Sequence, residues 1–372
     1  MEKVTSVSIA HLFDDSIFLR HYSHFISTFF KQERHEFITN TAGYNNITFS
    51  NNDGDANIIM FLRSENIRKP LQFIKRTVQT LREMDKSKLI IVHSFTGVDL
   101  LYFCMSPHLL KKTVWVIWGY DLYDYRSRKN SLYSRIHFLV KSQVIKKIPY
   151  VVARTPDYNL LQKWYKSKAE LLLVEPLYTN GEFESSKLTI KNDTSTPIKI
   201  TLGNSATKTN HHLEALDILS KYRNENLHLY IPLSYGDMEY AEIVKKRAKE
   251  IFGTKVTILD KFMGQDEYNK HLSQMDIGIF NIDRQQALGN ISYLLATGTK
   301  IYLDSASPLW EIFDGFSFQV HSVSDILSED FDAFTSLDIY ELTYNSEHAK
   351  EIYSEKHSVE CWNRVFNLAK GK

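Results

Sequence analysis

Short apolar runs alternate with longer amphipathic stretches throughout the first half of the chain. The runs are typical of buried parallel strands, and they are Val4–Leu12, Ile58–Leu62, Lys88–His93, Thr113–Trp118 and Pro149–Ala153. Between them, apolar residues recur every three or four positions, as on one helix face, over Ile17–Lys31, Pro70–Met84, Leu100–Leu110 and Leu132–Gln143. Strands that alternate with helices in this way predict an α/β fold built on a parallel, doubly wound sheet.

A polar stretch interrupts the pattern at residues 181–197, and a second alternating series follows it. The strands expected in this half are Lys199–Leu202, Leu227–Pro232, Lys255–Leu259, Ile277–Phe280 and Lys300–Leu303. The helices expected here are His211–Tyr222, Met238–Phe252, Gln265–Gln274, Gly289–Thr297 and a closing helix at Asn345–Lys370. We therefore expect a Rossmann-like domain at 1–180, a linker at 181–197, a second such domain at 198–344, and a C-terminal helix at 345–372 that can pack back on the first domain.

The composition is that of a folded protein without a membrane span. Of 372 residues, 43% are hydrophobic and 24% are charged, as in an ordinary soluble protein. Cys104 and Cys361 provide neither a disulfide framework nor a CxxC pair, which favours a reducing cytoplasm. The stretch Met1–Ala10 lacks the pattern of a signal peptide, and no apolar run reaches the roughly 18 residues that span a bilayer. The sequence predicts a cytoplasmic protein, either soluble or peripheral to a membrane.

Charge is divided unevenly along the chain. Residues 1–190 carry 26 Lys or Arg against 18 Asp or Glu, a net +8, whereas residues 191–372 carry 19 against 26, a net −7. The basic excess concentrates in segments 63–82 and 126–147, and the second of these contains no acidic residue. Such segments favour an anionic partner, namely a phospholipid surface, a lipid diphosphate or nucleic acid. An ordinary solvated face accounts for either segment alone.

The junction from Leu202 to His211 is the first candidate for a ligand site. An expected strand ends at Leu202, and a turn of small residues leads to a helix that begins near Asn210. This geometry presents unpaired backbone N–H groups and the positive helix end to an anion. Gly203 permits a close backbone approach, and the side chains that can cap the helix or bind phosphate are Ser205, Thr207, Thr209 and Asn210. A helix cap without any ligand accounts for the same residues.

A second strand-to-helix junction lies at Asn281–Asn290. Asp283 is suited to the N-cap, and Arg284 can pair with a diphosphate. The amides that can bind sugar hydroxyls are Gln285, Gln286 and Asn290. Although an arginine at a helix start is often a plain surface charge, this one follows an apolar strand at the carboxyl edge of the second sheet, where ligands bind in such folds.

Other candidates carry weaker signals. Trp118, Tyr120 and Tyr123 surround Asp121 at a strand end, where aromatic rings beside a carboxylate suit an acceptor sugar. The candidates for a catalytic base are Asp15, Asp121 and His93. Core packing equally explains Trp118 and His93, and an exposed turn equally explains Asp15 with its neighbour Asp14.

The segment Lys261–Gly264 also follows an expected strand, so Phe262 and Met263 can lie against a nucleobase. No DxD pair flanked by apolar residues occurs in the chain. We therefore expect no metal site and no cofactor.

Several of these blocks together resemble a known family. They are Ile117-Trp118-Gly119-x-Asp121-Leu122-Tyr123, Gly203-Asn204-Ser205 with Asn210 and His212, Arg284-Gln285-Gln286 followed by Gly289, Pro232 with Tyr235, and Pro308 with Trp310. In their order and spacing the chain resembles the 4-acetamido-4,6-dideoxygalactose (Fuc4NAc) transferases of enterobacterial common antigen synthesis, glycosyltransferase family 56. The chain departs from the family pattern at Phe13-Asp14-Asp15 and at Ala287-Leu288, which leaves the sugar, the acceptor and the base open.

The resemblance implies a GT-B fold, in which two Rossmann-like domains face each other across a cleft. It implies a dTDP-linked amino-deoxy sugar as donor and a lipid-linked saccharide as acceptor at the inner face of the bacterial plasma membrane, in enterobacterial common antigen or O-antigen synthesis. Taken with the candidates found from the residues themselves, the donor-binding residues would be Gly203, Asn204, Ser205, Asn210, Tyr235, Phe262, Met263, Arg284, Gln285, Gln286 and Gly289. The resemblance places the acceptor in the basic first half, beside an anionic membrane surface, where the residue-level candidates to bind it are Trp118, Tyr120 and Tyr123.

Our hypothesis is a metal-independent glycosyltransferase, with Arg284 and helix N-termini stabilising the diphosphate that leaves. Two alternatives stay open. A nucleotide-sugar epimerase of the same double-Rossmann build needs no acceptor. A non-enzymatic module would bind anionic glycolipid or nucleic acid through segment 126–147 without any dependence on nucleotide, whereas the glycosyltransferase hypothesis includes no nucleic-acid partner.

Overall fold

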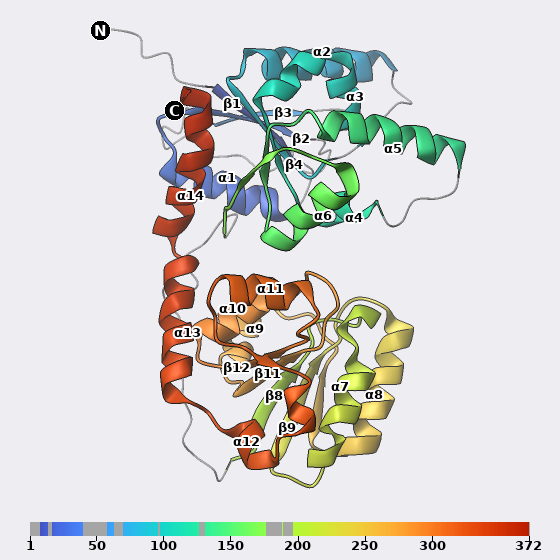
Figure 1. Cartoon of the computed structure of the whole chain (residues 1–372), viewed down its shortest axis with the longest axis vertical. Helices are drawn as coiled ribbons and strands as arrows, with labels where there is room; N and C mark the ends of the chain where they lie inside the picture. Colours follow the sequence, from blue (N-terminus) through green and yellow to red (C-terminus); the bar gives the residue numbers. More distant parts are fainter. Residues whose placement is uncertain are drawn as a thin grey trace. The chain divides into compact units, whose positions relative to one another are not determined.

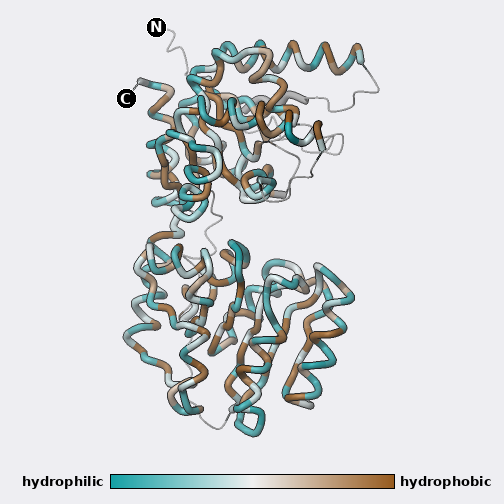
Figure 2. The backbone as a smooth tube through the Cα atoms, turned by 45° about the vertical axis from the view of Figure 1, so that its right-hand side comes forward, coloured by the Kyte–Doolittle hydropathy of each residue, from teal (hydrophilic) through white to brown (hydrophobic). Residues whose placement is uncertain are grey.

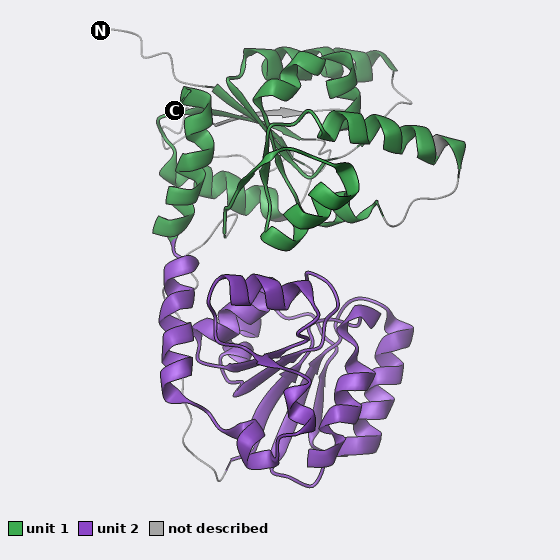
Figure 3. Cartoon of the chain, in the orientation of Figure 1, with its two compact units in different colours: residues 1–180, 355–372 green, residues 181–354 purple. Residues whose placement is uncertain are grey.

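The computed structural model describes residues 8–13, 17–39, 58–62, 70–95, 97–125, 131–175, 188 and 196–371, with 58–62 described by backbone alone. The chain forms two compact units (Figure 3). Unit 1 comprises residues 1–180 and 355–372, and unit 2 comprises residues 181–354. Each unit is built on its own parallel sheet with helices on both faces, which confirms the α/β prediction.

Over its described residues, the sheet of unit 1 has the order β3-β2-β1-β4-β5-β6-β7 (Figure 1). Its strands are β1 (Ser8–Phe13), β2 (Arg34–Thr39), β3 (Ile58–Leu62), β4 (Leu89–His93), β5 (Thr113–Val116), β6 (Tyr150–Val152) and β7 (Glu170–Leu172). Its helices are α1 (Ile17–Phe29), α2 (Pro70–Lys86), α3 (Gly97–Met105), η2 (Pro107–Lys112), α4 (Tyr120–Tyr123), α5 (Leu132–Ile145), α6 (Thr155–Tyr165), α14 (Glu355–Asn367) and η6 (Leu368–Lys370).

Alternating residues of each central strand enter two different cores. In β4, Ile90 and Val92 pack into the cluster that also receives side chains of α2, α3, α5 and α6. Leu89 and Ile91 pack into the opposite cluster, which receives side chains of α1 and α14. Because both faces are covered, both sets of alternating positions are apolar, which explains the continuous apolar run of this strand.

The sheet of unit 2, over its described residues, has the order β10-β9-β8-β11-β12-β13. Its strands are β8 (Ile198–Leu202), β9 (Leu227–Pro232), β10 (Val256–Leu259), β11 (Ile277–Phe280), β12 (Lys300–Leu303) and β13 (His321–Ser322). Its helices are η3 (Lys208–Asn210), α7 (His212–Leu219), η4 (Ser220–Tyr222), α8 (Met238–Phe252), α9 (Gln265–Leu272), α10 (Leu288–Ala296), α11 (Pro308–Gly315), η5 (Asp325–Leu327), α12 (Phe331–Thr335) and α13 (Ile339–Ile352).

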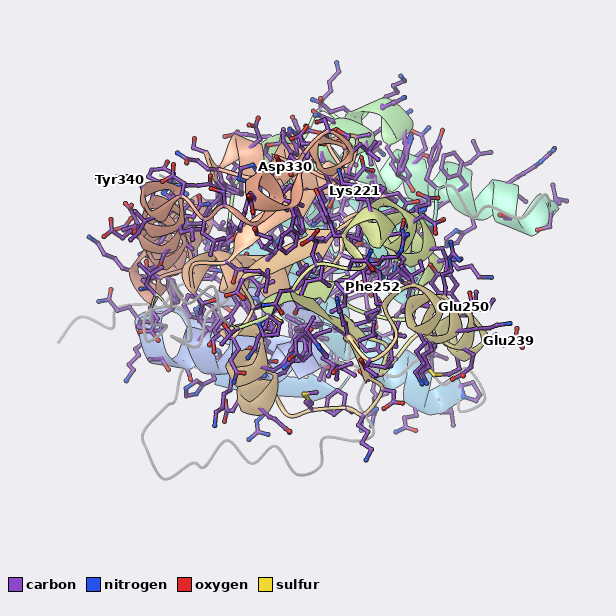
Figure 4. The ribbon with its side chains drawn as sticks, turned by 90° about the horizontal axis from the view of Figure 1, so that it is seen from below. Lys221, Glu239, Glu250, Phe252, Asp330 and Tyr340 are labelled. Carbon is purple, nitrogen blue, oxygen red and sulfur yellow. The ribbon has the colours of Figure 1, made fainter. Side chains whose placement is uncertain are left out.

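Helices α7 and α8 bury their apolar sides against one face of this sheet, and α9, α10, α11 and α13 against the other. Brown and teal residues alternate along these helices in Figure 2, as expected of helices with one buried side. The segment after β13 is held to the end of α7 by Lys221 (Figure 4), whose Nζ donates to the carbonyls of Ile326 and Glu329, both at 2.5 Å.

Two predicted helices are divided in the structure. The closing helix predicted at Asn345–Lys370 is two helices, α13 and α14. The reason is that α13 buries Ala349 and Ile352 in unit 2, while α14 buries Trp362 and Phe366 in unit 1. The helix predicted at Leu100–Leu110 ends at Met105 and is followed by a 3-10 turn, because Pro107 has no N–H to continue an α-helix. None of the described helices combines the length and apolar character needed to cross a membrane.

Candidate functional site

Three loops of unit 2 meet at the carboxyl ends of β8, β9 and β11. These strands are neighbours in the order β9-β8-β11, and β8 is the first of them in the chain. The chain runs from β8 through β9 to β10 on one side and then crosses back to β11 on the other side of β8, so the strand order reverses there. Such a switch point is where open α/β sheets bind their ligands. The loops are residues 203–211 after β8, 233–237 after β9 and 281–287 after β11.

Gly203 begins the β8 loop in a conformation that requires glycine. Its φ is +70°, and its N–H donates to the carbonyl of Ile279 at 2.9 Å. A Cβ added there would lie 2.5 Å from His212 Nε2 and 2.8 Å from Asn210 Oδ1. The turn can therefore pack directly against the start of α7 only with glycine at this position.

Asn210 holds the β8 loop from inside. The residue is fully buried, and its Oδ1 accepts a hydrogen bond from the N–H of Asn204 at 3.1 Å. Its Nδ2 donates to Thr207 Oγ1 at 2.8 Å and to the carbonyl of Ser205 at 3.1 Å. Asn210 thus positions the loop in this structure, and its assignment as a direct donor ligand stays a prediction. The helix also begins later than predicted, at His212 after the 3-10 turn η3.

The β9 loop is hydrogen-bonded to the β8 loop along the backbone. The N–H of Ala206 donates to the carbonyl of Tyr235, and the N–H of Asp237 donates to the carbonyl of Ala206, both at 2.8 Å. Gly236 has a φ of +115°, and a Cβ there would lie 2.7 Å from the Ala206 carbonyl oxygen. The Tyr235 hydroxyl, on a half-exposed side chain, accepts from Asn204 Nδ2 at 3.0 Å.

Gln286 connects the β11 loop to the β8 loop. Its Oε1 accepts hydrogen bonds from Thr209 Oγ1 at 3.0 Å and from Arg284 Nε at 2.5 Å. Its Nε2 donates to Asn204 Oδ1 at 3.3 Å. Arg284 remains exposed, so its guanidinium lies beside the polar loop and within reach of solvent. A cation beside backbone N–H groups and hydroxyls is suited to bind a diphosphate.

Asp283 joins the two loops instead of capping a helix. The residue before α10 is Ala287, with a φ of +61°, so the N-cap prediction for Asp283 is wrong. Asp283 Oδ2 lies 3.1 Å from His211 Nε2, and Glu214 Oε1 lies 3.3 Å from His211 Nδ1. Partial burial acts to lower the pKa of His211, but the hydrogen bonds to Asp283 and Glu214 outweigh it and raise that pKa above its ordinary value. Sequence reasoning did not single out His211, although a histidine at a helix start beside an acid was visible.

The remaining donor candidates lie around these loops. Gly289 is exposed in the first turn of α10, and no atom lies within 4 Å of an added Cβ, so packing does not require glycine there. Gln285 is half-buried on the β11 loop. Phe262 is 86% exposed and Met263 is half-buried, and both follow β10, the edge strand beside β9.

In unit 1, Asp121 is a structural carboxylate. It is 2% exposed, and its Oδ2 accepts from Trp115 Nε1 at 2.8 Å and from the Phe95 N–H at 3.0 Å. Its Oδ1 accepts from the Trp118 N–H at 3.0 Å. Burial raises the pKa of Asp121, and these hydrogen bonds oppose that effect. A carboxylate that is enclosed and hydrogen-bonded in this way has a structural role, and its assignment as the base stays a prediction.

His93 is likewise enclosed in the core of unit 1. It is 3% exposed, its Nε2 lies 3.4 Å from His11 Nδ1, and its ring stacks on Phe13 at 4.3 Å between centroids. Burial lowers the pKa of His93 to about 3. Burial and stacking give this ring a role in the core, and its assignment as a base stays a prediction. The third candidate, Asp15, lies outside the described residues together with Asp14.

The aromatic candidates of unit 1 remain near the surface. Tyr120 is 61% exposed and its hydroxyl is hydrogen-bonded to Ser94 Oγ, while Trp118 is half-buried against Phe18. The Tyr123 hydroxyl donates to Asp157 Oδ1 at 3.0 Å. Burial raises the pKa of Asp157 to about 6. Sequence reasoning missed Asp157, which follows β6 at the carboxyl edge of the sheet but belongs to no conspicuous motif.

Comparison with known proteins decides the identity of the chain. The family model described as 4-alpha-L-fucosyltransferase, glycosyl transferase group 56, matches residues 7–341. The chain belongs to this family. It is a nucleotide-sugar glycosyltransferase, as the resemblance implied.

Solved glycosyltransferase structures share its fold. A glycosyltransferase from Rickettsia africae ESF-5 matches with a TM-score of 0.67 at 12% identity, over 98% of this chain and 99% of that one. HepE of Anabaena, in complex with UDP, matches with a TM-score of 0.66 at 11% identity, over 97% and 100%. Sucrose-phosphate synthase of Thermosynechococcus elongatus matches with a TM-score of 0.65 at 11% identity, over 98% and 99%. The glycosyltransferase therefore has the GT-B fold.

The structure brings together most of the donor candidates of this glycosyltransferase. Its contacts link the residues Asn204, Ser205, Asn210, Tyr235, Arg284 and Gln286 across three loops. It does not bring Asp121 or His93 to a surface, and Phe262 and Met263 lie one strand beyond the three loops. Over the described residues, His, Cys, Asp and Glu side chains form no group of three or more suited to a metal ion.

Proposed function

We propose that this glycosyltransferase moves an amino-deoxy sugar from a dTDP-linked donor to a lipid-linked saccharide, in the synthesis of a bacterial surface polysaccharide such as enterobacterial common antigen or O-antigen. The observation that supports the proposal most is the contact of Gln286 with Arg284, Thr209 and Asn204. It holds one cation beside the amide and hydroxyl groups of Asn204 and Thr209 in the β8 loop, and a cation among hydrogen-bonding side chains is suited to a phosphate.

In this proposal the donor diphosphate lies against the β8 and β11 loops. Arg284 binds the diphosphate beside Ser205 and the side chain of Asn204, and Tyr235 and Gln285 contact the sugar or its phosphate. As the bond from sugar to phosphate breaks, negative charge grows on the leaving diphosphate, and Arg284 stabilises it in the place of a metal ion. HepE of Anabaena, which has this fold, was crystallised with UDP and glucose, which agrees with a nucleoside diphosphate as ligand.

The acceptor belongs to unit 1 in this proposal. The exposed ring of Tyr120 and the half-buried rings of Trp118 and Tyr123 offer flat apolar surfaces for a sugar ring. With Asp121 and His93 enclosed in the core, we favour Asp15 among the three as the base that takes the proton of the acceptor hydroxyl. A lipid-linked acceptor places the protein on the inner face of the plasma membrane as a peripheral protein.

A donor panel tests the proposal. The purified chain is heated with dTDP-, UDP- and GDP-sugars, and the ligand that raises the unfolding temperature most is then supplied with and without a lipid-linked saccharide. We expect the largest stabilisation from a dTDP-sugar, and transfer only with acceptor. Preference for a GDP-sugar would contradict the proposed donor, and conversion of the sugar without acceptor would favour an epimerase.

A further inference from the structure

Helix α5 exposes an apolar stripe on the side opposite its buried residues. Leu132, Ile136 and Leu139 are 75%, 53% and 61% exposed. Their spacing of four and then three residues places them on one side of the helix. Val144 and Ile145 face the core of unit 1 from the other side. Three large aliphatic side chains in one exposed stripe are unusual for a surface that meets only water.

Helix α2 carries a matching stripe. Leu71, Lys75, Val78 and Arg82 follow the same helical spacing and are all exposed. Leu71 is 84% exposed, and the neighbouring Ile74 is 57% exposed. The opposite side of α2 is buried through the residues Thr77, Thr80 and Met84. On α2, therefore, apolar and basic side chains alternate along one outward face.

The two stripes lie on the same side of the unit 1 sheet. Met84 of α2 and Ile145 of α5 enter the same core cluster, so both helices cover the same face (Figure 1). Helix α3 joins that cluster and packs on α5, and it exposes Leu101 at 38% and Met105 at 55%. We call the outer face of α2, α3 and α5 the apolar-basic face.

The charges on this face are positive. The exposed basic residues on or directly after α2 and α5 are Lys75, Arg82, Lys86, Lys88, Arg135, Lys146 and Lys147. Helix α5 contains no acidic residue, and the two acidic residues of α2 are each paired, Glu83 with Lys86 at 3.0 Å and Asp85 with His108 at 2.9 Å. A second copy of the chain on this face would bring like charges together, whereas an anionic surface would complement them.

We propose that the apolar-basic face docks on an anionic phospholipid bilayer. The aliphatic side chains of α2, α3 and α5 enter the boundary between headgroups and acyl chains, and the basic side chains bind the lipid phosphates. Lys141, although basic, takes no part, because it is buried and bonded to Asp124 at 2.6 Å. The inference rests on the proposed function in one respect, since a lipid-linked acceptor is delivered in such a membrane.

Vesicle co-sedimentation of the full chain tests the inference. The vesicles are phosphatidylcholine alone or phosphatidylcholine mixed with phosphatidylglycerol. One variant combines Leu132→Gln, Ile136→Gln and Leu139→Gln, and a second combines Lys75→Gln and Arg82→Gln. The control combines Leu327→Gln and Tyr340→Gln, which remove exposed apolar side chains of unit 2 (Tyr340 is labelled in Figure 4).

We expect the chain to sediment with anionic vesicles and far less with neutral ones. The basic variant should bind anionic vesicles roughly 25-fold more weakly, since each basic side chain near the surface contributes roughly fivefold. The aliphatic variant should lose roughly tenfold or more, and the control should bind as the original chain does. Because the changed side chains are exposed, all variants should unfold at the original temperature.

Three results would overturn the inference: equal binding to neutral and anionic vesicles, unchanged binding of both variants, or a change of oligomeric state in the aliphatic variant without loss of vesicle binding. Nucleotide-induced stabilisation is measured on the same samples. If the original chain is not stabilised by any nucleotide, the proposed function is contradicted and membrane docking is not. If the variants that no longer bind vesicles are still stabilised by nucleotide, the loss concerns membrane docking and not the donor site.

Discussion

Arg284 Nε donates to Gln286 Oε1 at 2.5 Å, and the same oxygen accepts a hydrogen bond from Thr209. One amide of the β11 loop therefore orients the arginine and ties it to the β8 loop. Replacing Gln286 by Ala should leave the fold intact and free the arginine from its position. We expect the KM for the donor to rise roughly tenfold, the effect of losing a hydrogen bond to a charged group, as measured by initial rates at varied donor concentration. Gln319→Ala, on an exposed side chain of unit 2, is the matched control, and equal KM values in both variants would contradict this role.

Gly203 and Gly253 both have a positive φ, but only Gly203 is crowded. A Cβ at Gly203 would lie 2.5 Å from His212. A Cβ at Gly253 would have no other atom within 4 Å. Gly253 has a φ of +58° and a ψ of −119°, a region that side chains other than glycine rarely adopt. Gly253→Ala should therefore lower the free energy of unfolding by about 1–3 kcal/mol, the cost of a sparsely populated backbone conformation. Gly203→Ala should lower it by about 3–4 kcal/mol, because the clash adds to this cost. Urea unfolding measures the free energy of unfolding of both variants. If both lose the same amount, the β8 loop rearranges to accommodate the added methyl group.

Asp121 is expected to be required for stability. Asp121→Asn replaces one acceptor oxygen by an N–H₂ group that faces the N–H donors of Phe95, Trp115 and Trp118. The free energy of unfolding should fall by about 2–4 kcal/mol, while turnover per folded molecule is retained below the unfolding temperature. Asp85→Asn, at an exposed ion pair, is the control and should change neither the free energy of unfolding nor the turnover. Loss of turnover at unchanged stability would support Asp121 as the base.

Three buried histidines should make the protein sensitive to acid. His11 lies 2.9 Å from His35 and 3.4 Å from His93, and burial lowers the pKa of all three, to about 3 for His35 and His93. Because the unfolded chain takes up protons near pH 6.5 and the folded chain does not, stability is full above pH 6.5 and falls as the pH drops toward 3. Each histidine contributes about 1.4 kcal/mol per pH unit in that window.

The slope of unfolding free energy against pH between 6.5 and 4 measures this effect. His93→Gln removes one titrating group of this cluster, so the slope should fall by about 1.4 kcal/mol per pH unit. His108→Gln, at an exposed position, should leave the slope unchanged. An unaltered slope in His93→Gln would mean that His93 takes up its proton in the folded protein as readily as in the unfolded chain.

The sequence was sufficient for the two α/β units because most central strands are apolar without interruption. Strand β4 was predicted from its β-branched run, which both faces of the sheet require. Strand β2 was missed because its buried His35 and Glu36 make it look polar. The apolar periodicity of a sequence treats every polar residue as exposed. It therefore misses strands in which polar side chains are buried and hydrogen-bonded in the core.

The candidate site was predictable only in part. Gly203 and Arg284 were visible because a glycine turn and a cation after a strand suit an anion. The roles of Asn210 and Asp121 were not visible, because they depend on partners that folding brings together. The link from Gln286 to Thr209 spans 77 positions of the chain, and local spacing carries no information about such a contact.

The binding of dTDP and UDP to Arg284→Ala, by isothermal titration, tests the central claim most directly. Arg247→Ala, on an exposed arginine of unit 2 that pairs with Asp217, is the control for loss of a surface charge. We expect Arg284→Ala to bind its preferred nucleotide roughly 30-fold more weakly or worse, the effect of losing a charge-assisted contact, while the control keeps its affinity. Unchanged affinity in Arg284→Ala would contradict the assignment of the donor diphosphate to the β8 and β11 loops.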